Sequence, residues 1–122
     1  MQATIIARVQ VSSPNRAEAY VTKDGSTIRE LHRTALQSLA EATLEPGQAS
    51  ERHYHVTSEE IYVVTKGSGS LEIDGETRRV VRGDSVLIPA GARHTLENNG
   101  TSELVFLCCC SPPYSHDDTH ME

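Results

Sequence analysis

The stretch GQASERHYHVTSEEIYVVTKG, residues 47–67, decides the fold of this chain of 122 residues. It begins and ends with glycine, and its second half is dominated by isoleucine, tyrosine, valine and threonine. These residues favour β-strands because branched and aromatic side chains pack well on a pleated surface. The stretch is therefore predicted to form two short strands, at 51–56 and 60–65.

Glycine and proline recur at short intervals on both sides of this stretch and separate further segments rich in strand-forming residues. Lys23-Asp24-Gly25-Ser26 and Asp74-Gly75 are typical of tight turns between antiparallel strands. Short strands between regular turn signals indicate an all-β sandwich or barrel. The other predicted strands are 5–11, 18–22, 27–31, 70–73, 76–82, 85–88, 94–98 and 103–109.

Two segments are less clear from their pattern alone. Residues 31–39 form the best helix candidate, although 38–44 could equally form a strand with its even-numbered residues on one face. The tail, 111–122, contains Pro112-Pro113 and several polar residues. We interpret the tail as an extended segment that lies over the domain or is partly disordered.

Length and charge restrict the possible functions. The length suits one domain spanning residues 1–122. The net charge of −6 argues against a nucleic-acid partner, since nucleic-acid binding normally requires a basic face. No apolar run approaches the roughly 20 residues that span a bilayer, so no membrane partner is expected. The start, MQATIIARVQ, lacks the features of a signal peptide, and we expect a cytoplasmic protein.

Four residues in this β pattern form a potential metal site. His53 and His55 are two residues apart, so on a strand both project from the same face. Glu60 opens the adjacent predicted strand, and His94 opens a distant one. Three imidazoles and a carboxylate that converge on one point suit a first-row divalent metal. On an octahedral ion these four ligands would leave two positions for water, substrate or dioxygen.

The remaining histidines and the cysteines carry weaker signals. A single histidine on a strand is far more often a surface or core residue than a ligand, and we interpret His32, His116 and His120 in that way. The three consecutive cysteines, 108–110, point alternately to opposite faces of a strand and suit neither a disulfide framework nor a structural zinc site. They are interpreted as small apolar residues at a strand end, or as thiols that reach the metal or a substrate.

Two spacings make the assignment specific. Residues 47–67 carry the pattern G(X)5HXH(X)4E(X)6G, which resembles the first conserved motif of the cupin superfamily. Residues 83–98 carry G(X)5PXG(X)2H(X)3N, which resembles the second. Both patterns match without a gap or a substituted landmark. By this resemblance the chain is identified as a small single-domain cupin, which implies an all-β double-stranded β-helix, or jelly-roll barrel.

The resemblance also implies roles for individual residues. His53, His55, Glu60 and His94 match the family's metal ligands. The ion would be one divalent transition metal, and manganese, iron, nickel, zinc and copper all occur among cupins. The motif glycines match positions that shape turns.

The carboxylate ligand has two candidates, because Glu59 directly precedes Glu60 and the family tolerates either spacing. Glu60 is preferred because the six-residue gap to Gly67 then fits the motif. Asn98, the last landmark of the second motif, is interpreted as structural.

Alternation along the strands predicts the pocket lining. Tyr62 is interpreted either as a core aromatic residue or as a proton donor and hydrogen-bond partner for a bound substrate. Together with the ligands, the predicted inward residues are Glu51, Tyr62, Val64, Leu96, Asn98, either Val86 with Ile88 or Leu87, and Phe106 or its neighbours within 103–109. The cavity is predicted to be mainly apolar and to suit a small organic molecule.

Three functions follow as hypotheses. The first is a metal-dependent enzyme acting on a small organic substrate, with oxygenase chemistry as the leading reaction and with Glu60 and Tyr62 as candidate catalytic groups. The second is a sugar or acid isomerase, epimerase or lyase, for which few additional inward polar residues are found. The third is a non-catalytic module that binds a small ligand or a metal. Strand 5–11 is expected to pair with a second copy in a homodimer.

Overall fold

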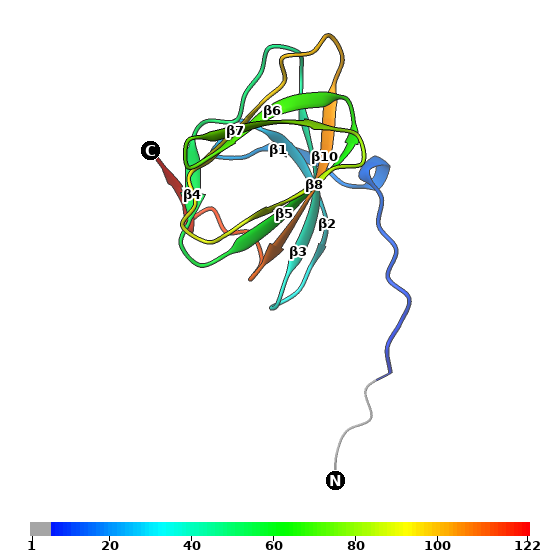
Figure 1. The fold of residues 1–122 in the computed structure, drawn as a ribbon. Helices are drawn as coiled ribbons and strands as arrows, with labels where there is room; N and C mark the ends of the chain where they lie inside the picture. Colours follow the sequence, from blue (N-terminus) through cyan, green and yellow to red (C-terminus); the bar gives the residue numbers. More distant parts are fainter. Residues whose placement is uncertain (1–5) are drawn as a thin grey trace.

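The computed structural model describes residues 6–122 and arranges their strands in two antiparallel sheets that enclose one core (Figure 1). The larger sheet has the order β1 (Ala19–Val21), β2 (Thr27–Arg33), β3 (Ser38–Leu44), β10 (Leu104–Ser111), β5 (Glu59–Lys66) and β8 (Ser85–Ile88). The smaller sheet has the order β11 (Thr119–Met121), β4 (His53–His55), β9 (His94–Glu97), β6 (Ser68–Ile73) and β7 (Glu76–Val81). A short 3-10 helix, η1 (Pro14–Arg16), precedes the first strand.

Strands that follow one another in sequence often lie in different sheets. β4 lies in the smaller sheet and β5 in the larger one, and β8 and β9 are divided in the same way. This alternation between two sheets gives the double-stranded β-helix, or jelly-roll barrel, that the motifs predict. No helix within residues 6–122 is long and apolar enough to cross a membrane.

Residues 38–44 form a strand, and the helix considered for 31–39 is wrong. Ser38, Ala40, Ala42 and Leu44 are buried, while the residues between them are partly exposed. β2 and β10 pair with β3 on its two sides and use its backbone hydrogen-bonding groups. A period of two in burial together with pairing on both edges determines the strand in preference to a weak helical period.

The two ends of the chain differ in how they meet the barrel. Residues 6–11 form no strand, and in Figure 1 they extend away from the barrel. The strand predicted for 5–11 is therefore wrong from residue 6 onward, and residue 5 lies outside the described part. The tail does lie over the domain, because β11 pairs with β4.

Asn98 joins the loops at one end of the barrel and is fully buried. Its side-chain amide donates to the carbonyl oxygens of Leu44 and Ser102, at 2.9 Å each. Its side-chain oxygen accepts from the backbone N–H of Gly100 at 3.0 Å. These bonds connect the ends of β3, β9 and β10, which agrees with the structural role predicted for this residue.

Candidate metal centre

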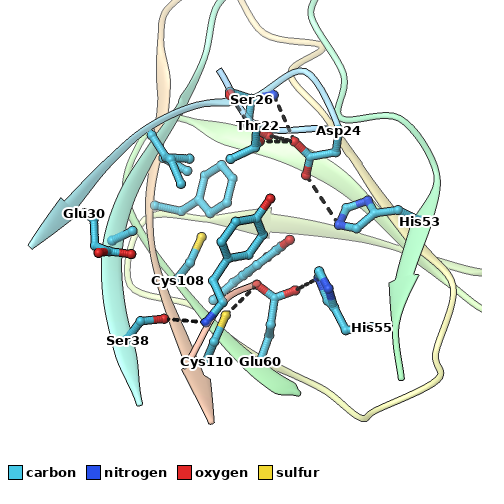
Figure 2. Close-up of a pocket in the computed structure, with 16 residues that line it drawn as sticks. Thr22, Asp24, Ser26, Glu30, Ser38, His53, His55, Glu60, Cys108 and Cys110 are labelled. Carbon is cyan, nitrogen blue, oxygen red and sulfur yellow. Dashed lines mark hydrogen bonds and ion pairs between the residues drawn. The ribbon is translucent and has the colours of Figure 1, made fainter. Parts of the chain in front are cut away.

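The four residues that were predicted as ligands lie together inside the barrel. His53, His55, Glu60 and His94 each offer one ligand atom, and these four atoms all lie within 4.8 Å of one another. All four side chains are buried, and the most exposed of the four residues, Glu60, retains 5% of its surface. Figure 2 shows His53, His55 and Glu60 among the residues that line a pocket.

Strand register explains how residues far apart in sequence meet. His53 on β4 is paired directly with His94 on β9, and their ring centroids lie 4.2 Å apart. His55 is on the same face of β4 as His53. Glu60 reaches the group from β5, which belongs to the opposite sheet. The sequence interpretation placed Glu60 on a strand adjacent to that of the two histidines, and this detail is wrong, because β4 pairs with β9 and β11.

Backbone carbonyl groups orient the three imidazoles. The Nδ1 atoms of His53 and His94 lie 2.7 Å and 2.9 Å from the carbonyl oxygens two residues earlier in the chain. Nδ1 of His55 lies 3.3 Å from the carbonyl oxygen of Asp118 in the tail. A carbonyl oxygen only accepts, so each Nδ1 carries the hydrogen when the ring is neutral. Each Nε2 then keeps its lone pair, as metal-binding histidines require.

The centre of the group contains buried polar atoms that have no hydrogen-bond partner among the described residues. Oε1 of Glu60 lies 3.0 Å from Nε2 of His55 and 3.3 Å from Nε2 of His94. Among the described residues, both Glu60 Oε1 and His94 Nε2 are buried without a hydrogen-bond partner. Lone pairs that face one another in a buried site are stable only with a proton or a cation between them. Nitrogen and oxygen donors in this arrangement fit a first-row divalent metal.

The electrostatics of the group depend on burial and on mutual attraction. Burial, with the nearby His94, lowers the pKa of His53 below its usual value. Burial also acts against a charged His55, but the hydrogen bond and attraction of Glu60 outweigh it and raise the pKa of His55. Burial alone would raise the pKa of Glu60, but the adjacent imidazoles of His55 and His94, which donate to the carboxylate when they are protonated, instead hold this pKa well below its ordinary range. Glu60 is therefore an anion at neutral pH.

The strand face separates the two possible carboxylates. Glu60 is buried with the histidines, whereas Glu59 is exposed on the other face of β5. Tyr62 lies on the same face as Glu60, is 5% exposed, and lines the pocket against the ring of Phe106 at a centroid distance of 4.9 Å. Burial raises the pKa of Tyr62, so its phenol is neutral at physiological pH.

Most other predicted inward residues are buried, with one exception. Val64, Leu96, Asn98 and Ile88 are buried, and Val86 packs against the core, so Leu87 is the outward residue of β8. Glu51 is exposed, because the chain enters β4 only at residue 53. Within residues 6–122 the histidines at 32, 116 and 120 lie outside the four-residue group.

The pocket contains more polar groups than the sequence indicated. Carboxylates and hydroxyls from the turn between β1 and β2, from β2 and β3, and from the tail lie among apolar side chains at its wall. Its lining residues are Thr22, Asp24, Ser26, Ile28, Glu30, Ser38, Ala40, Ala42, His53, His55, Glu60, Tyr62, Phe106, Cys108, Cys110 and Tyr114. Sequence reasoning interpreted residues 23–26 only as a turn and the tail only as a cover, so it missed Asp24 and Tyr114. Their positions depend on contacts between distant segments.

The tail also supports the histidine strand. The carboxylate of Asp118 accepts hydrogen bonds from the backbone N–H groups of Val56, Thr57 and Ser58 at 3.0 to 3.2 Å. Burial alone would raise the pKa of Asp118, but these N–H groups outweigh it and lower the pKa. Through its carbonyl oxygen the same residue orients His55, so the tail helps to shape the candidate metal centre.

Two of the three cysteines face the pocket. Cys108 and Cys110 line it, and the thiol of Cys110 donates to Oε2 of Glu60 at 3.4 Å. Cys109 between them points away, as alternation requires. Burial and the charge of Glu60 raise the pKa of Cys110, so its thiol stays protonated. The structure thus places one thiol against a candidate ligand and leaves the other oxygen of Glu60 for the centre.

Comparisons with known proteins agree with this fold. An uncharacterized protein of Methanocaldococcus jannaschii is 44% identical over 112 residues, which cover 88% of this chain and 90% of that protein. KdgF of Halomonas sp. has the same fold, with a TM-score of 0.79, 18% identity, and coverage of 88% of this chain and 97% of that one. Streptomyces Pac13 has a TM-score of 0.77 at 16% identity, with coverage of 91% and 88%.

A family model described as a cupin domain matches residues 40–110, which include both motifs and all four candidate ligands. The match covers more than half of the chain, and the fold and motif spacings agree with it. The chain belongs to the cupin family.

Proposed function

We propose that this protein binds one divalent transition metal through His53, His55, Glu60 and His94 and is a metal-dependent enzyme that acts on a small organic molecule. The observation that carries the proposal is the pair of unpartnered buried atoms, Glu60 Oε1 and His94 Nε2, at the centre of four converging ligand atoms. A site built only for structure would be closed by its ligands, whereas this one opens on a lined pocket.

The bound metal would act as a Lewis acid that polarises an oxygen of the substrate. The residues of the chain supply the rest of the site. Glu60 brings a buried negative charge, and the three carbonyl-oriented imidazoles present their lone pairs from fixed directions. Tyr62 is proposed as a hydrogen-bond donor to the substrate, since it lines the pocket and its phenol is neutral.

The polar lining favours isomerase, epimerase or lyase chemistry as the reaction class. Such reactions move protons and water, so they need hydrogen-bonding groups around the substrate, and the pocket offers hydroxyls and carboxylates beyond the ligands. A protein of the same fold, Pac13, is described as a nucleoside dehydratase, so this barrel can hold non-oxidative chemistry. The ligand set alone favours the second candidate, oxygenation, because three imidazoles and one carboxylate resemble the sites of several cupin dioxygenases.

Elemental analysis of freshly purified protein, followed by turnover assays with and without air, tests the proposal. We expect about one divalent transition metal per chain, and conversion of small hydroxylated compounds that does not require oxygen. Glu59→Gln is the matched control for Glu60→Gln, because Glu59 is the exposed neighbour on the same strand. Turnover that consumes oxygen would favour the oxygenase. A protein that binds no divalent ion after reconstitution would overturn the proposal, and a metal-loaded protein without turnover would favour a binding module.

A homodimer is the proposed assembly. Residues 6–11 are extended and exposed, and the apolar side chains of Val9 and Val11 retain 92% and 71% of their surface. Within the described chain this segment pairs with no strand, which supports the idea that it packs against a second copy. Light scattering at micromolar concentration is expected to give the mass of a dimer, and a monomer would contradict this.

A further inference from the structure

Asp24 lies outside both cupin motifs and yet faces the metal centre (Figure 2). The carboxylate is held by its own turn: Oδ1 accepts from the hydroxyl of Thr22 at 2.6 Å and from the backbone N–H and hydroxyl of Ser26 at 2.9 Å and 2.7 Å. Its backbone carbonyl oxygen accepts from the N–H of Glu51 at 2.7 Å, which ties the turn to the start of the histidine segment. Asp24 is thus fixed in direction and position.

The second oxygen of Asp24 is directed at the centre. Oδ2 lies 3.4 Å from Nε2 of His53, the atom that would bind the metal, and the side chain is only 13% exposed. A neutral His53 has its hydrogen on Nδ1, which donates to the carbonyl oxygen of Glu51, so it donates nothing to Oδ2. No other hydrogen bond or ion pair to Oδ2 is found within residues 6–122. This negative charge is therefore exposed to whatever occupies the pocket.

The charges of the wall have one sign. Three carboxylates, Asp24, Glu30 and Glu60, line the pocket, and none of its described lining residues is a lysine or an arginine. Glu30 is paired at the rim with Arg33, which lies 3.4 Å away, and Lys23 beside Asp24 donates instead to the carbonyl oxygen of Thr119. A divalent ion among the ligands would be balanced by Glu60 and Asp24 together. A further anion would then find no free positive charge in the wall.

Tyr114, in the tail, adds a hydroxyl group to the pocket wall that also contains Asp24. It lines the same pocket, and its hydroxyl is buried without a hydrogen-bond partner among the described residues. Burial raises its pKa, so it is a neutral group that can donate a hydrogen bond and accept one. Asp24 can only accept. The two together suit a ligand that carries hydroxyl or amino groups.

We propose that Asp24 is a specificity-determining residue that excludes anions from the metal centre and that, with Tyr114, selects neutral or cationic hydroxylated molecules over phosphorylated or carboxylated ones. This inference rests on the proposed function, since it places the ligand beside the metal. The observation that supports it is the negative charge of Asp24, which is held in place by Thr22 and Ser26. The substrate is accordingly a neutral polyol or sugar, or a cationic amino alcohol, and not a sugar phosphate.

Anion binding to the cobalt(II)-substituted full-length protein tests this directly, with azide and inorganic phosphate as probes and the visible absorption of cobalt as the readout. Asp24→Asn removes the charge and keeps the oxygen that accepts from Ser26. A unit charge about 6 Å from the bound anion weakens its binding about 3-fold in a medium like bulk water and about 100-fold at an effective dielectric constant of 20. Because Asp24 is mostly buried, we expect azide to bind at least about 10-fold more tightly to Asp24→Asn.

Three controls distinguish charge from shape. Imidazole above its pKa is a neutral ligand of cobalt, and its affinity is expected to change less than about twofold. Asp24→Glu keeps the charge and is expected to exclude azide as the wild type does. Glu45→Gln removes one exposed carboxylate that lies outside the pocket lining, and it is expected to have no effect.

Each result has a separate meaning. Equal azide affinity in the wild type and Asp24→Asn would overturn the inference and leave the metal proposal intact. Equal gains for azide and imidazole would also overturn it, because Asp24 would then act by obstruction. Failure of the wild-type chain to bind cobalt at all would overturn the proposed function on which the inference depends.

Discussion

Metal-induced thermal stabilisation is the property that depends most directly on the four-residue centre, and Glu60→Gln is the change that isolates it. An ion that binds only the folded chain stabilises it by about 4 kcal/mol when its free concentration is about 1,000 times Kd. An unfolding entropy of about 2.1 cal/mol/K per residue gives about 0.26 kcal/mol/K for 122 residues. The wild-type Tm is therefore expected to rise by about 16 °C on saturation with zinc or manganese.

Glu60→Gln keeps the shape of the side chain and removes the only negative charge within the ligand group. We expect the metal to bind about 100-fold more weakly, since even residues that support ligands indirectly contribute 10- to 100-fold. At the same metal concentration the stabilisation falls to about 1.4 kcal/mol, and the rise in Tm to about 5 °C. Glu59→Gln, on the exposed face of the same strand, is expected to retain the full rise.

Differential scanning calorimetry of metal-free and metal-loaded protein at pH 7.5 measures the rise in Tm of the wild type and of each variant. The pKa of Glu60 is lowered in the folded state, so its ionised form stabilises the fold above the pKa of the unfolded state, and this contribution is lost only as acid lowers the pH through the folded pKa. At pH 7.5 the carboxylate is therefore charged in every wild-type sample. A wild-type rise that survives Glu60→Gln and disappears in Glu59→Gln would refute the assignment of the ligand.

Three further predictions concern the pH dependence of metal binding, the buried side chain of Asn98, and Asp118 in the tail. Metal affinity is expected to fall below about pH 6, because protons compete for the imidazole nitrogens, and unchanged metal content after prolonged dialysis at pH 5 would argue against imidazole ligation. Asn98→Ala removes three hydrogen bonds from a fully buried residue and is expected to lower the free energy of unfolding by about 3 kcal/mol in urea titrations, with a change below 1 kcal/mol as the contrary outcome. Asp118→Asn weakens the bonds to three backbone N–H groups, so amide exchange in β11 is expected to become about tenfold faster at neutral pH. Because the pKa of Asp118 is lowered in the folded state, its contribution is complete above the unfolded pKa and is lost as the pH falls through the folded one, so both proteins should exchange alike in strong acid.

Much of the barrel was predictable because strand signals are local. The hairpin around residues 23–26 and the strands that flank Asp74-Gly75 follow from turn chemistry and alternation, and the structure contains both. The errors in the predicted strands lie where pairing with a distant strand determines whether a segment becomes a strand. Residues 38–44 carry a pattern that suits either helix or strand, and β2 and β10 determine the outcome. Residues 6–11 have strand-forming side chains and no neighbouring strand in the described chain.

The sequence by itself determined the four converging residues, because motif spacing and a strand period of two place their side chains on inward faces. It also separated Glu60 from Glu59, through the six-residue gap to Gly67, and the structure buries the first and exposes the second. Only the tertiary structure decided what surrounds them. Asp24 and Tyr114 come from a turn and a tail with no motif of their own, and the hydrogen bonds that hold the turn and the tail at the pocket join segments far apart in the chain. Local sequence specifies the direction of a side chain, whereas long-range packing determines which side chains share a cavity.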